Sequence, residues 1–136
     1  MKILVIDGMG GGVGRAVVER IKAELTNIEI MAVGANAIAT TAMLKAGADF
    51  GATGENAVVY NASRADVIIG AMGIAFANAM YGEISPKMAA AVSKSHAHKI
   101  LIPIEKSNVT IAGVMNTSMQ ACVDDVIVHL RARRTS

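Results

Sequence analysis

Eight residues near the start of the chain carry the clearest chemical signal, Asp7-Gly8-Met9-Gly10-Gly11-Gly12-Val13-Gly14. They contain five glycines within seven residues and follow a short apolar run, residues 3–6, which predicts a buried strand. An amphipathic pattern begins directly after them and predicts a helix. Glycines allow close backbone approach, and the unpaired amide groups at a helix start favour an anion such as a phosphate. This segment, the glycine turn (residues 7–14), therefore predicts a phosphate cradle.

Two charged residues flank the glycine turn. Arg15 falls in the first turn of the predicted helix, where a positive side chain opposes the helix dipole. We interpret it either as a phosphate contact or as a side chain that points to water. Asp7 ends the strand and could bind a hydroxyl group or a cation, but we favour a role as a cap of the turn through backbone amides.

The glycine spacing resembles a cofactor motif only in part. The dinucleotide pattern G-x-G-x-x-G fails from Gly8 because its last position is Val13. Gly8, Gly12 and Gly14 instead fit G-x-x-x-G-x-G, which resembles the cofactor turn of short-chain dehydrogenases, with Asp7 in place of the usual Thr. The resemblance covers the first strand, turn and helix. It lacks the family's catalytic Tyr and Lys four residues apart, and no acid follows the second predicted strand to hold a ribose.

Two further interpretations of the turn stay open. Residues 11–16 resemble the G-G-V-G-K-[ST] end of a Walker motif, which would indicate an NTPase. Arg15 replaces the phosphate-binding Lys and Ala16 lacks the hydroxyl that ligates magnesium, so this interpretation is disfavoured. The glycines could also form only a tight turn that lets the helix pack on the strand, although five glycines exceed that need.

The rest of the chain alternates apolar strands with helical patterns. Strands are expected at residues 3–6, 28–33, 66–70 and 100–104, with an antiparallel edge strand at 109–114. Helices are expected at residues 13–25, 36–44, 74–80, 85–94 and 119–130, and a helix begun at Thr53 within the ambiguous segment 50–61. The alternation predicts one α/β domain over residues 1–136, a three-layer Rossmann-like domain whose mainly parallel sheet has about five strands.

In such sheets the ligand crevice lies outside the carboxyl ends of the strands, near the switch in strand order. Asn36 follows the second predicted strand, where it could cap a helix while facing the crevice, although we favour capping alone. Gly70 and Gly73 occupy the loop after the third predicted strand. The predicted cofactor-binding residues are Asp7, Gly8, Gly10, Gly11, Gly12, Gly14, Arg15, Asn36, Gly70 and Gly73.

Composition excludes several classes of protein. Of 136 residues, 53% are hydrophobic and 18% charged, which excludes a disordered chain. An aromatic content of 3% and a formal net charge of +2 argue against nucleic acid as a partner. The longest uncharged stretch, residues 67–82, is too short and too interrupted by glycine to favour a membrane span. We expect a cytoplasmic protein, because the start of the chain does not resemble a signal peptide.

Metal-ligating residues are sparse. His96 and His98 alternate at ligand spacing, but they precede a predicted strand and so lie at the amino edge of the sheet, opposite the crevice. Cys122 is the only cysteine, which excludes an internal disulfide and a zinc framework. We therefore expect no metal site.

Three segments carry a family resemblance: residues 6–12, 36–40 and 51–57. Together they resemble a small bacterial family of domains of unknown function, and the similarity covers nearly the whole chain. The family brings no assigned reaction. The resemblance implies a compact cytoplasmic domain with a Rossmann-like start.

The sequence leads to one main functional hypothesis and two alternatives. The main hypothesis is a small domain that binds a nucleotide, such as NAD(P), or a phosphorylated metabolite at the glycine turn, with no catalytic residue identified. A minimal NAD(P)-dependent oxidoreductase is the first alternative, for which Tyr60, Tyr81 or Glu105 would have to donate a proton. The second is a non-catalytic interaction subunit, a homodimer whose glycine turn is empty. The main hypothesis is also compatible with a homo-oligomer, most simply a dimer.

Overall fold

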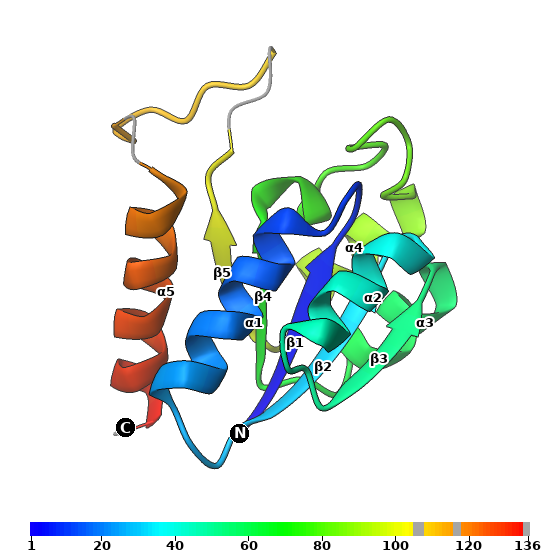
Figure 1. The fold of residues 1–136 in the computed structure, drawn as a ribbon. Coiled ribbons are helices and arrows are strands. Elements are labelled where there is room, and N and C mark those ends of the chain that lie inside the picture. The colour runs from blue at the N-terminus through cyan, green and yellow to red at the C-terminus, as the bar shows by residue number, and fades with distance from the viewer. Residues whose placement is uncertain (105–107, 116–117, 135–136) are drawn as a thin grey trace.

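The computed structural model describes residues 1–104, 108–115 and 118–134, and within them the chain forms one five-stranded sheet covered by helices (Figure 1). The strands are β1 (Lys2–Asp7), β2 (Glu29–Gly34), β3 (Phe50–Thr53), β4 (Val67–Ala71) and β5 (His98–Ile102). The helices are α1 (Gly12–Glu24), α2 (Ala37–Lys45), α3 (Glu55–Ala62), the 3₁₀ helix η1 (Met72–Ala75), α4 (Pro86–Lys94) and α5 (Met119–Arg134). The pairings between these five strands are all parallel.

Strand β1 lies at the centre of the sheet, between β2 and β4. Its register aligns Ile3 with Ile30 of β2 and with Val67 of β4. Side chains that alternate along β1 enter two separate cores, because successive residues of a strand point to opposite faces. Ile3 packs with α1 and α5, whereas Leu4 packs with α3 and α4. The continuous apolar run of β1 is explained by this double burial.

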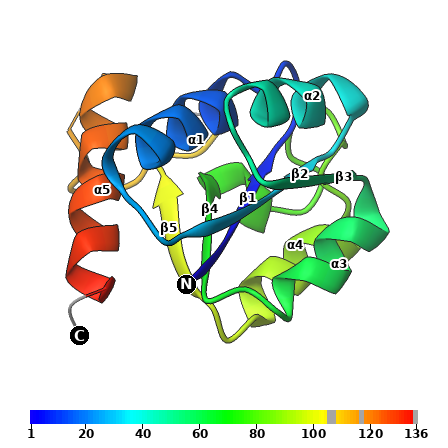
Figure 2. The ribbon, with the colours of Figure 1, turned by 60° about the horizontal axis from the view of Figure 1, so that its bottom comes forward.

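The helices form two outer layers around the sheet (Figure 2). Helices α1, α2 and α5 cover one face, and α3 and α4 cover the other. Helix α4 begins where its sequence predicts, because the Ser85 side chain accepts the Met88 N–H and Pro86 occupies the first turn. The predicted three-layer α/β architecture with a sheet of five strands is confirmed.

Two expected elements differ in the structure. Residues 50–53 form the edge strand β3, and the helix that we placed from Thr53 begins only at Glu55, after Gly54 with its φ of +101°. The predicted antiparallel edge strand at residues 109–114 is wrong. In that segment Val109 makes an isolated bridge and residues 112–113 form a turn, with a φ of +83° at Gly113, so no strand is added and the described sheet ends at β5 on that side.

The expected helix over residues 74–80 is also shorter than predicted. Only η1 is helical there, and turns follow it in which Asn78, Met80 and Tyr81 have positive φ. An α-helix requires negative φ at each residue, so these residues cannot continue one.

The strand order β3-β2-β1-β4-β5 places the topological switch between β1 and β4. The chain leaves β1 toward α1 on one face and leaves β4 toward η1 and α4 on the other face. The two loops therefore part above the carboxyl ends of these strands, where α/β sheets bind ligands. Within the described residues, none of the helices has the length and apolar character needed to span a membrane.

Candidate functional site

A hollow of about 260 Å³ lies above the switch between β1 and β4. It is lined by seven consecutive residues of the first loop, Asp7 to Val13, and by Ala71, Gly73, Met80 and Ile104. The hollow therefore joins the loops that follow β1, β4 and β5. We call it the glycine hollow.

The Asp7 side chain is hydrogen-bonded to the backbone at both ends of the glycine turn. Its carboxylate accepts the Gly8 N–H at Oδ1 (2.8 Å) and the Gly14 N–H at Oδ2 (2.5 Å), and the residue is 4% exposed. Burial raises the pKa of Asp7, the two amide bonds lower it, and the charge of Glu83 raises it further, with a net upward shift. Asp7 thus holds the turn and one amide of the α1 start, the capping role that its sequence position favours.

The glycines of the turn fall into two groups. Three of them are closely packed: a Cβ would lie 2.7 Å from Met80 Sδ at Gly8, 2.8 Å from Ala39 Cα at Gly11, and 2.5 Å from Met43 Sδ at Gly14. Gly11 also has a φ of +78°. At Gly10 and Gly12 a Cβ would meet no atom of a described residue within 4 Å. Packing and backbone conformation thus explain the first three glycines but not the last two.

The amide groups of the turn divide in the same way. Gly11 N–H donates to Gly8 O (3.0 Å), and Met9 N–H donates to Glu83 Oε1 (2.6 Å). The N–H groups of Gly10, Gly12 and Val13 find no acceptor among the described residues. The last two belong to the first turn of α1, where intrahelical acceptors are absent. These amides are the groups that remain for an anion.

Glu83 is a site residue that the sequence analysis missed. It lies in the loop before α4, and its carboxylate accepts both the Met9 N–H and, at Oε2, the Asn36 side-chain amide (2.7 Å). Three loops, those after β1, β2 and η1, meet at this carboxylate. No local motif marks Glu83, because its partners are 47 and 74 residues away in the chain.

The Asn36 side chain links the loops after β1, β2 and η1 through hydrogen bonds. Its side-chain oxygen caps α2 by accepting the Ala39 N–H (2.9 Å), and its amide nitrogen donates to Met9 O (2.9 Å) as well as to Glu83. The predicted cap is confirmed. The Asn36 side chain is not among the residues that line the glycine hollow.

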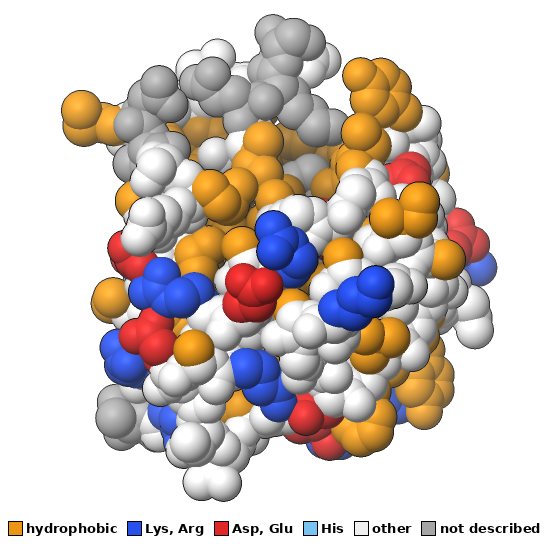
Figure 3. Space-filling view, viewed as in Figure 1, with side chains coloured by type: hydrophobic (Ala, Val, Ile, Leu, Met, Phe, Trp, Pro, Cys, Tyr) orange, Lys and Arg blue, Asp and Glu red, His pale blue; other side chains and the backbone are white. Residues whose placement is uncertain are grey.

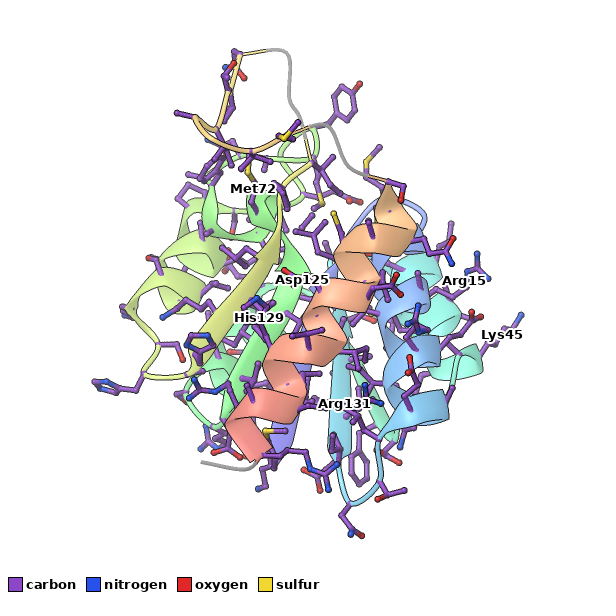
Figure 4. The ribbon with its side chains drawn as sticks, turned by 90° about the vertical axis from the view of Figure 1, so that its left-hand side faces the viewer. Arg15, Lys45, Met72, Asp125, His129 and Arg131 are labelled. Carbon is purple, nitrogen blue, oxygen red and sulfur yellow. The ribbon has the colours of Figure 1, made fainter. Side chains whose placement is uncertain are left out.

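The remaining predicted site residues lie in different places. Gly73 lines the glycine hollow, whereas Gly70 is buried in β4, where a Cβ would meet Ile6 O at 2.6 Å. Arg15 points outward from α1 and pairs with Glu19 (3.3 Å), with more than half of its side chain exposed (Figure 4). The structure therefore brings residues 7–13 of the glycine turn together with Gly73 around the hollow, but not the predicted site residues Gly14, Arg15, Asn36 and Gly70.

A second hollow of about 270 Å³ lies beside the first, between the end of β5 and the start of α5. Apart from Thr110, the side chains of its described lining are apolar, but polar atoms of the lining are exposed there as well, and Ile104 belongs to both hollows. The lining residues are Met72, Ile102, Pro103, Ile104, Val109, Thr110, Ile111, Val114, Met115, Met119 and Cys122. Figure 3 shows hydrophobic side chains gathered in a hollowed area at this end of the molecule. We call this cavity the apolar hollow.

Two of the three proposed proton donors, Tyr60 and Tyr81, line neither hollow. Tyr60 lies on α3 with Arg64 stacked over its ring at 3.7 Å, near the amino ends of the strands. Tyr81 is 97% exposed in the loop before α4. Glu105 lies outside the described residues, as does Lys106.

No cluster of three or more metal-ligating side chains occurs in residues 1–104, 108–115 and 118–134. His98 begins β5 at the amino edge of the sheet, as predicted, and His129 of α5 faces Asp125 one turn away (3.3 Å) (Figure 4). Burial lowers the pKa of His98, and the nearby charges of Arg133, His129 and Lys99 lower it further.

Comparison with known proteins gives one family and one fold. Residues 2–135 match the model of a family described as "Domain of unknown function (DUF3842)". No curated protein sequence matches the chain significantly. A similar solved structure is a dodecameric FMN-dependent Ubix-like decarboxylase from Escherichia coli O157:H7, with a TM-score of 0.53 and 17% identity over 100% of this chain and 96% of that chain. At this identity the similarity shows a shared fold.

Proposed function

Because this chain belongs to the family of domains of unknown function DUF3842, its activity has to be inferred from the site, and we propose that it binds a nucleotide or another phosphorylated metabolite. The phosphate would lie in the glycine hollow, against the first turn of α1. Gly10 and Gly12 carry this proposal. Both residues are exposed, and their N–H groups find no acceptor among the described residues, although neither packing nor backbone conformation requires glycine at either position.

The topology supports the same position. The strand order 3-2-1-4-5 is the order with which dinucleotide-binding α/β sheets begin, and the glycine hollow lies at its switch point. The structurally similar decarboxylase is described as FMN-dependent, so this fold holds a phosphorylated flavin in at least one other protein. FMN is therefore the first nucleotide to test, ahead of NAD(P).

Backbone amides, not basic side chains, would hold the phosphate. Within the described residues, neither Lys nor Arg lines the glycine hollow, and the charges of Asp7 and Glu83 lie beside it. Amides of a helix start bind anions through hydrogen bonds and the helix dipole, without a counter-charge. We therefore expect moderate affinity with a weak dependence on ionic strength.

The experiment is a calorimetric titration of the purified protein with FMN, NADH, NADPH, AMP and ribose 5-phosphate. Gly12→Leu would place a bulky side chain on a residue that lines the glycine hollow, and we expect it to abolish binding of whichever compound binds. Ala23→Leu adds the same side chain at an exposed position near the other end of α1 and should leave binding unchanged. Binding that survives Gly12→Leu, or no binding of any compound, would refute the proposal and favour an interaction subunit.

A role as an oxidoreductase would need a proton donor at the site. Neither Tyr60 nor Tyr81 lies there, and the proposal therefore includes binding without an assigned reaction. Oxidation of NADPH in the presence of a panel of carbonyl compounds would instead favour the oxidoreductase.

We also propose that the chain forms a homo-oligomer through the β3 edge of the sheet. Edge strands leave backbone groups unpaired, and β3 pairs only with β2. Phe50 of β3 is 55% exposed, and the partly exposed Leu44 of α2 packs over Gly51 beside it. Exposed apolar side chains next to an open sheet edge suit a second copy of the chain. The similar decarboxylase is described as dodecameric.

A further inference from the structure

The glycine hollow, in which we place a phosphate, also contains a buried acid. Asp7 is one of the residues that line the hollow, and it is 4% exposed. Its two carboxylate oxygens accept the N–H groups of Gly8 and Gly14, so they lie in the same turn as the amides proposed to hold the ligand. A phosphate at those amides would therefore lie close to a carboxylate that water hardly reaches.

The surroundings of Asp7 favour its neutral form. Glu83, which accepts the Met9 N–H from the loop before α4, adds a second negative charge that acts on Asp7. Arg15 of α1 points outward and pairs with Glu19 (Figure 4). The described residues of α2, β4 and η1 that contact the turn are uncharged. Burial and the charge of Glu83 outweigh the two amide bonds, so the pKa of Asp7 is raised.

Two anions held close together away from water favour a shared proton, because the proton relieves their repulsion. On the premise that the glycine hollow binds phosphate as proposed above, we infer that Asp7 and the ligand hold one proton between them. The proton comes from solvent and lies between an oxygen of Asp7 and an oxygen of the phosphate. Each oxygen of Asp7 accepts one amide and has a lone pair left for this bond. Asp7 therefore sets the pH dependence of binding.

The shared proton determines the direction of that pH dependence. A free phosphate monoester is mainly a dianion above about pH 6. Where Asp7 is ionised as well, each binding event must take up one proton, so the affinity falls as the pH rises, by as much as about tenfold per pH unit. Amides that bound the phosphate without a shared proton would favour the dianion, and the affinity would then rise as the phosphate ionises.

The first test uses the natural chain. It is titrated by calorimetry with FMN, or with the next of the five phosphate compounds that binds, between about pH 6.5 and about pH 9, and two buffers of different ionisation enthalpy give the number of protons taken up. We expect proton uptake within this range and an affinity at least about threefold weaker at pH 9 than at pH 7.5. Binding without proton uptake throughout the range would overturn this inference while the phosphate site itself stood. Failure of all five compounds to bind would overturn both proposals.

Two variants assign the proton to Asp7. Asp7→Asn has nearly the same shape but no charge, so we expect it to bind the same compound without proton uptake and with no loss of affinity between pH 7.5 and pH 9. Asp49→Asn changes a carboxyl group outside the hollow, which is bonded to Lys22, and should behave like the natural chain. Proton uptake that persists in Asp7→Asn would overturn the inference.

A third variant covers the case in which Asp7→Asn does not fold. Glu83→Gln removes the neighbouring negative charge and leaves Asp7 in place. Asp7 then takes up a proton less readily, so the pH range over which binding takes up protons should move toward acid. An unchanged range in Glu83→Gln would show that the proton is held elsewhere.

Discussion

At the scale of single residues, two carboxylates organise the candidate site. Asp7 is next to the glycines in sequence, and its position at a strand end indicated the capping role that its bonds to Gly8 and Gly14 show. Glu83 could not be identified in the same way, because its function depends on a contact with Met9 across 74 residues. A hydrogen bond between residues that are close in sequence can be predicted from the sequence. A contact between distant residues can be predicted only when the order of the strands is known.

The titration of Asp7 gives a first prediction. Its pKa is raised above the ordinary value of 3.8, so the folded state binds more protons than the unfolded chain just above pH 3.8. The stability that Asp7 contributes is complete below pH 3.8 and is lost as the pH rises through the raised pKa. Asp7→Asn removes this titration, and the asparagine can accept only one of the two amides. We expect the destabilisation by Asp7→Asn, measured by urea unfolding, to be larger at about pH 4 than at about pH 8.

Asp49 is the matched control for this experiment. Its bonds to Lys22 Nζ (2.8 Å) and to the Ile30 N–H (2.8 Å) lower its pKa below 3.8. Its contribution is therefore present above pH 3.8 and is lost as the pH falls through the lowered pKa. The effect of Asp49→Asn should shrink toward acid, opposite to that of Asp7→Asn. The same pH trend in both variants would contradict the assignment for Asp7.

A second prediction concerns Glu83 as the tie between loops. Glu83→Ala leaves the Met9 N–H and the Asn36 amide without their carboxylate partner, so we expect a loss of about 1–3 kcal/mol in the free energy of unfolding. Hydrogen exchange should accelerate at the Met9 amide. The Gly14 amide, which Asp7 holds, should keep its protection and serves as the internal control. Unchanged exchange at Met9 would show that Glu83 does not restrain the turn.

At the scale of elements, a continuous apolar run or a clear helix cap predicted the element correctly, whereas short segments without such a signal were predicted wrongly. Strand β1 and helix α4 were found because double burial gives a continuous apolar run and a Ser-Pro start gives a cap. Strand β3 has only four residues, of which three are exposed, so it lacks an apolar signal and forms through its pairing with β2. The segment 109–114 has strand-like composition, but it forms no strand of the described sheet, with only an isolated bridge at Val109. Pairing, which is non-local, decided both outcomes.

The approach of α1 to α2 gives a third prediction. Gly11 has positive φ and leaves no room for a Cβ against Ala39, whereas Gly10 faces open space. We therefore expect Gly11→Ala to lower the free energy of unfolding by more than about 1 kcal/mol, from backbone strain and displacement of α2. Gly10→Ala should change it by less than about 0.5 kcal/mol. Both values come from urea unfolding curves, and similar values for the two variants would show that the turn does not set this packing.

At the scale of the whole molecule, the sheet has two unlike ends. Beyond β5 the chain continues through residues 108–115 to α5, and the two hollows open on this side of β1. The β3 edge has no such cover, and Phe50 and Leu44 are exposed there. The proposed ligand site at one end and an open, apolar sheet edge at the other are compatible with binding and self-association at the same time. We therefore assign the two proposed functions to separate surfaces.

This separation gives the last prediction. Phe50→Glu combined with Leu44→Glu places charges on the β3 edge, where burial against a second copy would be unfavourable. Light scattering after gel filtration should show an oligomer for the natural chain and a monomer for this variant. Tyr81→Glu, at a residue that is 97% exposed far along the chain from β3, should leave the mass unchanged.

Because the glycine hollow includes neither Phe50 nor Leu44, the monomer should bind the same phosphate compounds with the same affinity. A monomeric natural chain would refute the interface, and a monomer without binding would mean that the site needs the second copy.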